Sequence, residues 1–391
     1  MFVLRSYRYS LRPTRAQLRT LDTWLRLTRE LFNGALQERR DAWQKQRVRV
    51  SCYDQMAQLP AIRAVRPEFA VIPIVVLRGV LRRLDRAFTA FFRRCKAHET
   101  PGYPRFRGRG RFESLLIDDL GKGNPLVAGK QRVAVPLLGK IKLKLHRQLA
   151  GRPKAMRLKR EGLHWFVTFA CADVPAKPLP PTGREVGIDL GLTNFLATSD
   201  GDCLPNERPG GRAALRLARS QRRVSRRKRG GQRRRQAVRL LAKDHAHVAN
   251  QRRERHITIA RALVARYDRI VVENLNVKGL ARSALAKSVS DAGWASFVWW
   301  LHVKAEEAGR EVVAVNPAGT SQECPACSNV VAKTLSERTH RCDCGLTCDR
   351  DVAAARVILG RGQRPQGAAS PVRGRQRSAR PKFAEDLSTH P

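Results

Sequence analysis

The first hundred residues show one alternating stretch and two helical patterns of apolar positions. Residues 2–11 alternate between apolar and polar side chains, which predicts a strand. From Pro13 onward the apolar positions follow helical spacing, at Leu18, Leu21, Leu25 and Leu31. A second helical pattern covers residues 74–95 with leucine, valine and phenylalanine. We therefore expect a strand followed by two amphipathic helices.

The polar face of the second predicted helix is almost entirely arginine. It carries one aspartate, Asp85, against Arg78, Arg82, Arg83, Arg86, Arg93 and Arg94. A solvated helix face is one interpretation, but so few acids leave most of these arginines without a partner on the helix. This composition favours an anionic partner.

Proline and glycine divide residues 101–182 into short alternating runs at 140–145, 156–159 and 165–171. This pattern predicts a small β-barrel or sheet. Residues 175–183 (PAKPLPPTG) predict a linker and the main domain boundary.

From residue 184 onward, buried strands alternate with helices, which indicates an α/β unit. Strands are expected at residues 185–190, 195–198, 269–275 and 311–315. Helices are expected as a long pair within 212–255, at 297–308, and at 349–359 with Gly360 ending the last one. The pair within 212–255 holds 17 Lys or Arg against two acids.

Composition narrows the class of protein. The 391 residues include 77 Lys or Arg and 33 Asp or Glu, a formal net charge of +44. Such a field collects polyanions and does not suit an enzyme of small neutral metabolites, so nucleic acid is the expected partner. At 42% hydrophobic residues the chain can still build packed cores. With neither a secretory signal nor a spanning segment evident, we expect a cytoplasmic, nucleoid-associated protein of prokaryotic type and no membrane partner.

Five of the nine cysteines lie between residues 324 and 348. Cys324 and Cys327 form one knuckle, and Cys342 and Cys344 form another 14 residues later. Four thiolates at this spacing predict a tetrahedral zinc site, with disulfides or buried thiols as the alternative. The second knuckle is C-x-C rather than C-x-x-C, so His340 and Cys348 could replace a ligand.

Three carboxylates stand out in this basic chain. Asp189 and Glu273 lie within apolar predicted strands, where an unpaired charge is costly, and Asp351 begins the last predicted helix. Taken separately, Asp189 could cap a turn, Glu273 could pair with an arginine, and Asp351 could be favoured by the helix dipole at the N-terminus of its helix. Together, three acids from separate elements can hold two magnesium ions that activate water for phosphodiester hydrolysis.

These motifs resemble those of the TnpB family, transposon-encoded RNA-guided DNA nucleases related to type V CRISPR effectors. GIDLGLTN, VVENLNVKGL and DRDVAAARVIL are similar to its three RuvC motifs, carrying Asp189, Glu273 and Asp351 in turn. The stretch from TSQECPACS to HRCDCGL is similar to its zinc-binding insertion. The N-terminal segments YSLRPTRAQ, AFTAFFRRCK and GYPRFRGRGRFESL also match, so the resemblance covers about residues 5–360.

The resemblance implies a multi-domain α/β protein with an RNase H-like (RuvC) nuclease domain and an inserted zinc-binding knuckle, preceded by a β-barrel with a helical insertion. The barrel would comprise residues 1–12 and 101–182, and the helical insertion 13–100. The nuclease domain would comprise 183–320 and 349–360, the zinc-binding insertion 321–348, and a disordered basic tail 361–391.

The resemblance also implies an Mg²⁺-dependent endodeoxyribonuclease of a transposable element. Its partners would be a guide RNA and target double-stranded DNA with a short adjacent motif. Its metals would be two Mg²⁺ ions and one structural Zn²⁺. The expected nucleic-acid contacts are Arg222, Arg223, Arg226, Arg227, Lys228, Arg229, Tyr103 and Arg107.

The sequence departs from the family pattern at a few positions. Ala353 stands where Asn is usual two residues after the third acid, Ser328 where Gly is common, and Ile257-Thr258 where His-Lys is usual. A guide-dependent DNA-binding regulator with impaired cleavage, and a classical transposase, are therefore the alternatives.

Overall fold

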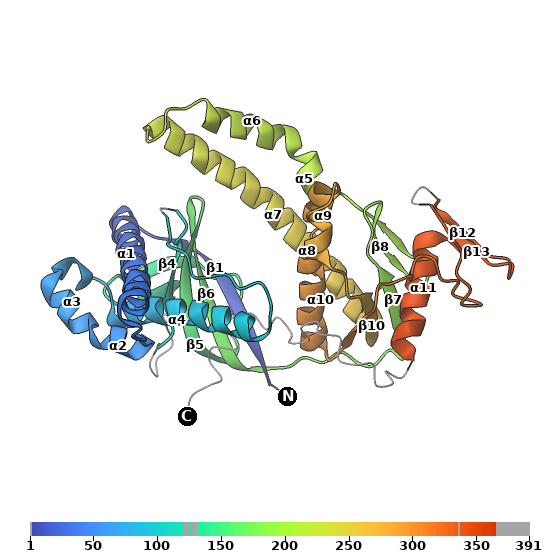
Figure 1. Cartoon of the computed structure of the whole chain (residues 1–391), viewed down its shortest axis with the longest axis horizontal. Helices are drawn as coiled ribbons and strands as arrows, with labels where there is room; N and C mark the ends of the chain where they lie inside the picture. The colour runs from blue at the N-terminus through green and yellow to red at the C-terminus, as the bar shows by residue number, and fades with distance from the viewer. Residues whose placement is uncertain (1, 109, 121–124, 127–130, 335–336, 365–391) are drawn as a thin grey trace. The chain divides into compact units, whose positions relative to one another are not determined.

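The structure is a computed structural model, and it describes residues 2–108, 110–120, 125–126, 131–334 and 337–364. The described chain divides at Pro175 into two compact units (Figure 1). Each unit has its own hydrophobic core. This division falls at the start of the proline-rich segment 175–183. No helix among the described residues is both long and apolar enough to cross a membrane.

The first unit is built on a six-stranded antiparallel sheet. Its strands are β1 (Phe2–Arg12), β2 (Ser114–Ile117), β3 (Arg132–Val135), β4 (Gly139–Lys144), β5 (Arg152–Glu161) and β6 (His164–Pro175). Their order is β2-β5-β6-β1-β4-β3, so β2 and β3 are the edge strands. The sequence pattern predicted either a small β-barrel or a sheet. The observed strand order fits the sheet better than a closed barrel, because no hydrogen-bonded ladder joins β2 to β3 among the described residues.

Helices pack on this sheet through apolar side chains. They are α1 (Arg15–Gln46), α2 (Cys52–Ala57), α3 (Leu59–Val65), the short 3₁₀ helix η1 (Pro67–Phe69) and α4 (Ile74–Lys96). α1 begins two residues after Pro13 because Thr14 and Gln17 form a reciprocal capping box. α2 and α3, which are too short to show a helical period, were not expected from the sequence.

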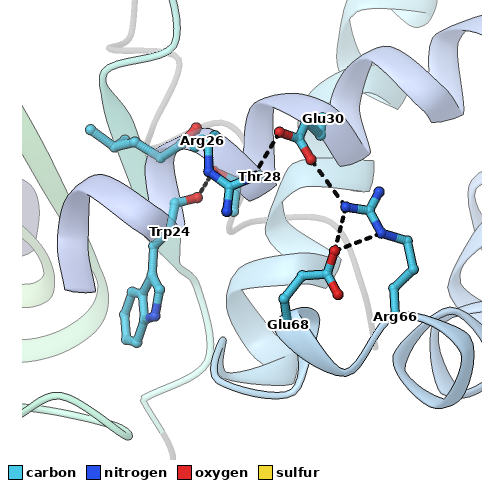
Figure 2. A network of polar contacts seen from close by, with 7 residues as sticks. Trp24, Arg26, Thr28, Glu30, Arg66 and Glu68 are labelled. Atoms are coloured by element: carbon cyan, nitrogen blue, oxygen red, sulfur yellow. Dashed lines mark hydrogen bonds and ion pairs between the residues drawn. The ribbon is translucent and has the colours of Figure 1, made fainter. Parts of the chain in front are cut away.

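Polar contacts join α1 to the segment around η1 (Figure 2). Arg66 pairs with Glu30 of α1 at 3.3 Å and donates through Nε to Glu68 at 2.8 Å. Beside them, the buried Thr28 hydroxyl donates to the Trp24 carbonyl at 2.6 Å. The ion pairs are exposed and contribute little, so the buried apolar face of α1 supplies most of the stabilisation.

The second unit is built on a five-stranded mixed sheet. Its strands are β7 (Glu185–Asp189), β8 (Asn194–Thr198), β9 (Cys203–Pro205), β10 (Arg269–Glu273) and β11 (Glu311–Val315), in the order β11-β10-β7-β8-β9. β10 is parallel to both β7 and β11, whereas β8 is antiparallel to β7 and β9. The strands expected from apolar runs are confirmed. The remaining strand, β9, is short and exposed, and it was not expected because no apolar run marks it.

The remaining elements of this unit are helices and one small hairpin. The helices are α5 (Pro209–Arg212), α6 (Ala214–Ser225), α7 (Gln232–Arg266), α8 (Val277–Leu280), α9 (Ala286–Ala292), α10 (Trp294–Ala308) and α11 (Arg350–Gln363). The hairpin consists of β12 (Thr339–Arg341) and β13 (Thr347–Asp349). α6 and α7 are the expected long basic pair, and Ser220 of α6 donates to Asp244 of α7 at 2.6 Å.

α11 lies against β7 and β10 through two glycines. A Cβ at Gly187 of β7 would overlap the Ala355 carbonyl and lie 2.6 Å from the Leu359 amide nitrogen. A Cβ at Gly362 would lie 2.5 Å from Val271 of β10. The expectation that Gly360 ends this helix is wrong, because the helix continues to Gln363 and uses Gly362 for this close contact. Residues 365–391, where a disordered tail was expected, lie outside the described residues.

Replacing Gly187 with alanine is expected to destabilise the protein by about 3 kcal/mol or more, because the new methyl group displaces α11 from the sheet. Denaturant unfolding of the variant measures this loss. Gly360→Ala is the matched control on α11, since a Cβ there meets nothing within 4 Å. The control should be neutral or stabilising by up to about 1 kcal/mol. Equal stability of the two variants would contradict this packing.

Candidate carboxylate site and cysteine knuckle

The parallel pairing of β7 and β10 brings two of the predicted acids to one edge of the sheet. Val272 pairs with Ile188, so Glu273 and Asp189 are the next residues in register, and each ends its strand. The carboxyl ends of adjacent parallel strands lie at the same edge of the sheet. Residues 84 positions apart in sequence therefore become neighbours by register alone.

The N-terminal turn of α11 brings the third acid to the same edge. Asp349 caps the helix by accepting hydrogen bonds from the Asp351 and Val352 amides at 2.8 and 3.2 Å. Asp351 lies one turn before Ala355, the residue that contacts Gly187, and Asp189 lies two positions after Gly187 on the same face of β7. The glycine contact thus aligns the two acids.

The three carboxylates act on one another through their charges. Burial raises the pKa of Asp189 to about 7, with further contributions from the charges of Glu273 and Asp351, while Arg350 opposes the shift. Burial also raises the pKa of Glu273 against the opposing effects of Thr320 and Arg361. A raised pKa means that negative charge at this edge is costly without a cation.

Two polar side chains that the sequence analysis did not select hold these acids. The Thr320 hydroxyl donates a hydrogen bond to Glu273 Oε1, and Asn194 Nδ2 donates to Asp351 Oδ2 at 3.4 Å. Asn194 was quoted within the first motif, and Thr320 begins the cysteine-containing segment. Neither residue type is unusual in a loop or strand, so their roles become visible only through the tertiary contacts.

The cysteines form the tighter cluster. The sulfurs of Cys324, Cys327, Cys342 and Cys344 all lie within 4.8 Å of one another. In the part of the chain that the structure describes, no other set of three or more cysteine, histidine or acid ligand atoms is gathered this closely.

The cysteine geometry fits zinc. The Cys324–Cys344 and Cys327–Cys342 sulfur separations are 3.7 and 3.5 Å, close to the edge of about 3.8 Å expected for a tetrahedron with zinc–sulfur bonds of about 2.3 Å. All four are free cysteines rather than disulfides. Burial acts to raise the pKa of Cys324, but hydrogen bonds from the Cys327 and Ala326 amides outweigh it and lower that pKa to about 6.

His340 and Cys348 are not part of the four-sulfur cluster. They face each other as a pair in the β12–β13 hairpin. The buried His340 contacts Lys333 and helps to lower the pKa of Cys324, so it supports the cluster from outside. The four cysteines of the sequence prediction are therefore the set that the fold gathers.

Arg361 connects the carboxylate site to the start of the cysteine segment. From α11 it donates to the Asn316 and Ala318 carbonyls at 2.9 and 2.8 Å and pairs with Glu323 at 2.5 Å. These contacts of Arg361 hold the loop that carries Thr320. At the other end of the segment, β13 leads directly into α11 and Asp351. The knuckle therefore fixes residues of the carboxylate site at both of its ends.

The predicted nucleic-acid contacts come from both units of the chain. The end of α6 and the turn before α7 present six exposed cations: Arg222, Arg223, Arg226, Arg227, Lys228 and Arg229. Tyr103, 45% exposed, packs edge-on against Phe88 and Phe91 in the first unit. Arg107 is partly buried over the Phe32 ring. Within the second unit, no described contact joins these six cations to the three carboxylates.

His256, next to the variant Ile257-Thr258 positions, belongs to the core of α7. Its ring stacks on Phe195 and meets Phe297 edge-on, and its Nε2 lies 3.0 Å from the Ala292 carbonyl oxygen. Burial lowers its pKa to about 4. It is a neutral packing residue and not a member of the carboxylate site.

Fold and site together define a multi-domain α/β protein with three carboxylates at one sheet edge and a four-cysteine, zinc-finger-like insertion. Three family models match the chain: "Probable transposase" over residues 168–284, "Cas12f1-like, TNB domain" over 294–358, and "Helix-turn-helix domain" over 1–47. The matches cover the first two acids and the complete cysteine cluster together with Asp351.

Relatives with printed names match most of the chain. A protein of Streptomyces pristinaespiralis named "Putative RNA-guided DNA endonuclease" is 31% identical over 97% of this chain and 94% of its own length. "Putative RNA-guided DNA endonuclease InsQ" of Escherichia coli (strain K12) is 28% identical over 74% of this chain and 75% of its own. The chain belongs to the same family as these relatives, the TnpB family.

Solved structures give a weaker likeness. The chain titled "Structure of the mini-RNA-guided endonuclease CRISPR-Cas_phi3" matches with a TM-score of 0.47 and 9% identity, over 92% of both chains. A second, titled "Cryo-EM structure of the Cas12f1-sgRNA-target DNA complex", matches with a TM-score of 0.36 and 15% identity, over 91% of this chain and 99% of that one.

Proposed function

We propose that this protein is an RNA-guided DNA endonuclease of a transposable element, and that Asp189, Glu273 and Asp351 form its hydrolytic site. The observation that carries this proposal is the convergence of three carboxylates from β7, β10 and α11 on one sheet edge. The mixed sheet, with β11, β10 and β7 parallel and β8 and β9 antiparallel, supports an RNase H-like nuclease unit. The names of the full-length relatives support the same activity.

The acid site suits magnesium. Carboxylate oxygens are its preferred protein ligands. Burial and the neighbouring acids raise the pKa of Asp189, so its negative charge is costly without a cation. When bound, Mg²⁺ ions would activate water and stabilise the leaving oxygen of the DNA strand. Thr320 and Asn194 orient Glu273 and Asp351 by donating hydrogen bonds to them. Arg350, 3.5 Å from Asp351, adds a positive charge beside the site.

The four cysteines would hold one structural zinc. The described residues of 324–334 and 337–344 include few buried apolar side chains, so a metal would replace a hydrophobic core in this segment. The zinc would keep the segment ordered between Thr320, which bonds Glu273, and α11, whose first turn carries Asp351. Its role in this proposal is positional.

The nucleic-acid partners would be a guide RNA and a target duplex with a short adjacent motif. The exposed cations at the end of α6 would contact phosphates, since hybrid recognition relies on backbone charge and shape. Tyr103 and Arg107 would contribute contacts from the first unit. A net charge of +44 supports a polyanion of this size.

One departure from the family pattern bears on a second function. Ala353, at the position where the family usually has Asn, is buried, and it lies about 200° around α11 from Asp351. A side chain at that position does not share the face of Asp351, so this change by itself gives no reason to expect loss of cleavage. A guide-dependent regulator that binds DNA without cutting is the second candidate, and the presence of all three acids argues against it.

Cleavage of guide-matched DNA by the protein purified with its RNA tests the proposal. In Mg²⁺ the wild type should cut the matched duplex, and Glu273→Gln should reduce cutting at least about 100-fold. Matched binding without any cleavage would favour the regulator, and strand-transfer products without RNA would favour a classical transposase. An unmatched duplex is the control for guiding.

A further inference from the structure

Two neighbouring arginines of α4 have different partners. Arg82 forms an ion pair with Asp118 at 2.6 Å. Arg83 lies with its guanidinium carbon 4.6 Å from the centre of the Phe112 ring and donates to Ser114 Oγ at 3.3 Å. Within the described part of the chain, Arg83 forms no ion pair with a carboxylate. The arginine-rich face of α4 therefore contains a cation that the protein leaves without a counter-charge.

A second arginine converges on the same aromatic pair. Arg107 lies 5.6 Å from the centre of the Phe32 ring, and the Phe32 and Phe112 rings are 5.7 Å apart. Asn33 fixes the position of Arg107 by accepting from its amide at 2.8 Å and donating to its carbonyl at 3.1 Å. Arg107 Nε is buried and has no hydrogen-bond partner among the residues described.

This arrangement is costly without an anion. Burial lowers the pKa of Arg83 to about 10, and the positive charges of Arg107 and Arg157 lower it further in the same direction. Like charges at a partly buried place repel, and a buried donor without a partner is destabilising. An anion between the guanidiniums would relieve both effects. Arginine forks fit the tetrahedral oxygens of phosphate better than lysine does.

We propose that Arg83 and Arg107 bind one phosphodiester group of a nucleic-acid strand. The identity of this polyanion rests on the proposed function, and the positive charge of the whole chain favours it over a small carboxylate. Phe32 and Phe112 are 1% and 3% exposed, so they can support the guanidiniums but cannot stack on a nucleotide base. The site would therefore contact the phosphate backbone and would not distinguish one base sequence from another.

Binding of the full-length protein to two probes in the absence of Mg²⁺ tests this site. The probes are the RNA that copurifies with the protein, transcribed anew, and an unmatched DNA duplex. Arg83→Gln and Arg107→Gln should each weaken binding to one probe about tenfold. Each should also reduce the slope of log affinity against log salt concentration for that probe by about one. The affected probe identifies the strand. Arg82→Gln, which removes the same charge next to Arg83, should weaken binding less than threefold because Arg82 is engaged by Asp118.

Thermal unfolding without nucleic acid separates binding from a structural role. Arg83→Gln removes a like charge, so its Tm should stay the same or rise, and Arg83→Lys should retain part of the affinity. Binding by Arg83→Gln equal to that of Arg82→Gln on both probes would overturn the proposal, as would a loss explained by unfolding. If the wild type fails to cleave guided DNA but Arg83→Gln still weakens binding selectively, the nuclease function fails and this site stands.

Discussion

Replacing Asp189 with asparagine is expected to abolish DNA cleavage and, at the same time, to stabilise the metal-free protein. Burial, then Glu273 and Asp351, raise the pKa of Asp189 from 3.8 to about 7. A raised carboxyl pKa gives the folded state stability that is present below the unfolded pKa and is lost as the pH rises through 7. Asparagine removes the repelled charge. The gain should be about 1–2 kcal/mol at pH 8, reduced from the full shift because the side chain is partly exposed.

Denaturant unfolding in a chelator, at pH values between 4 and 8, measures this effect. The advantage of Asp189→Asn should be largest at pH 8 and should shrink toward pH 4, where the wild-type carboxyl is protonated in the folded state. Mg²⁺ should stabilise the wild type more than the variant. Asp202→Asn is the control, because exposed Asp202 pairs with Arg266 and its loss should give no gain. A variant that cleaves normally would contradict the site, and one that is less stable at pH 8 would contradict the repulsion.

Replacing Cys342 with serine is expected to release zinc, loosen residues 321–348 and reduce cleavage at least about tenfold. The reason is positional: the knuckle lies between Thr320, which bonds Glu273, and the helix that carries Asp351. Bound zinc measured by mass spectrometry under native conditions, together with the cleavage rate, checks this result. A zinc chelator should reproduce it in the wild type.

Cys95→Ser is the matched control, since Cys95 is an exposed cysteine of the first unit outside the cluster. It should retain zinc and activity. Cleavage at the wild-type rate by a Cys342→Ser protein without zinc would show that the knuckle does not position the acids. Retention of one zinc by that variant would show that another residue, such as His340 or Cys348, replaces the lost ligand.

Much of the fold could be predicted because the local pattern of apolar residues indicates which segments of the chain are buried. The strands that end at Asp189 and Glu273 are apolar runs, and both are buried on the sheet. The C-x2-C and C-x-C spacing identified four sulfurs that the fold gathers within 4.8 Å. The error at Gly360 has the same origin: glycine usually ends a helix, but a packing contact at Gly362 extends this one.

The sequence by itself determined the chemistry that is available: three acids in or beside apolar segments, four clustered thiols and a large positive charge. Tertiary structure alone decided which of these groups meet. The register of β7 on β10 sets Asp189 level with Glu273, and Gly187 lets α11 approach closely enough to add Asp351. The same holds for Thr320 on Glu273, and for Arg83 and Arg107 around two phenylalanines. Periodicity describes which face of an element is buried, whereas contacts between residues far apart in the sequence depend on how those faces pack.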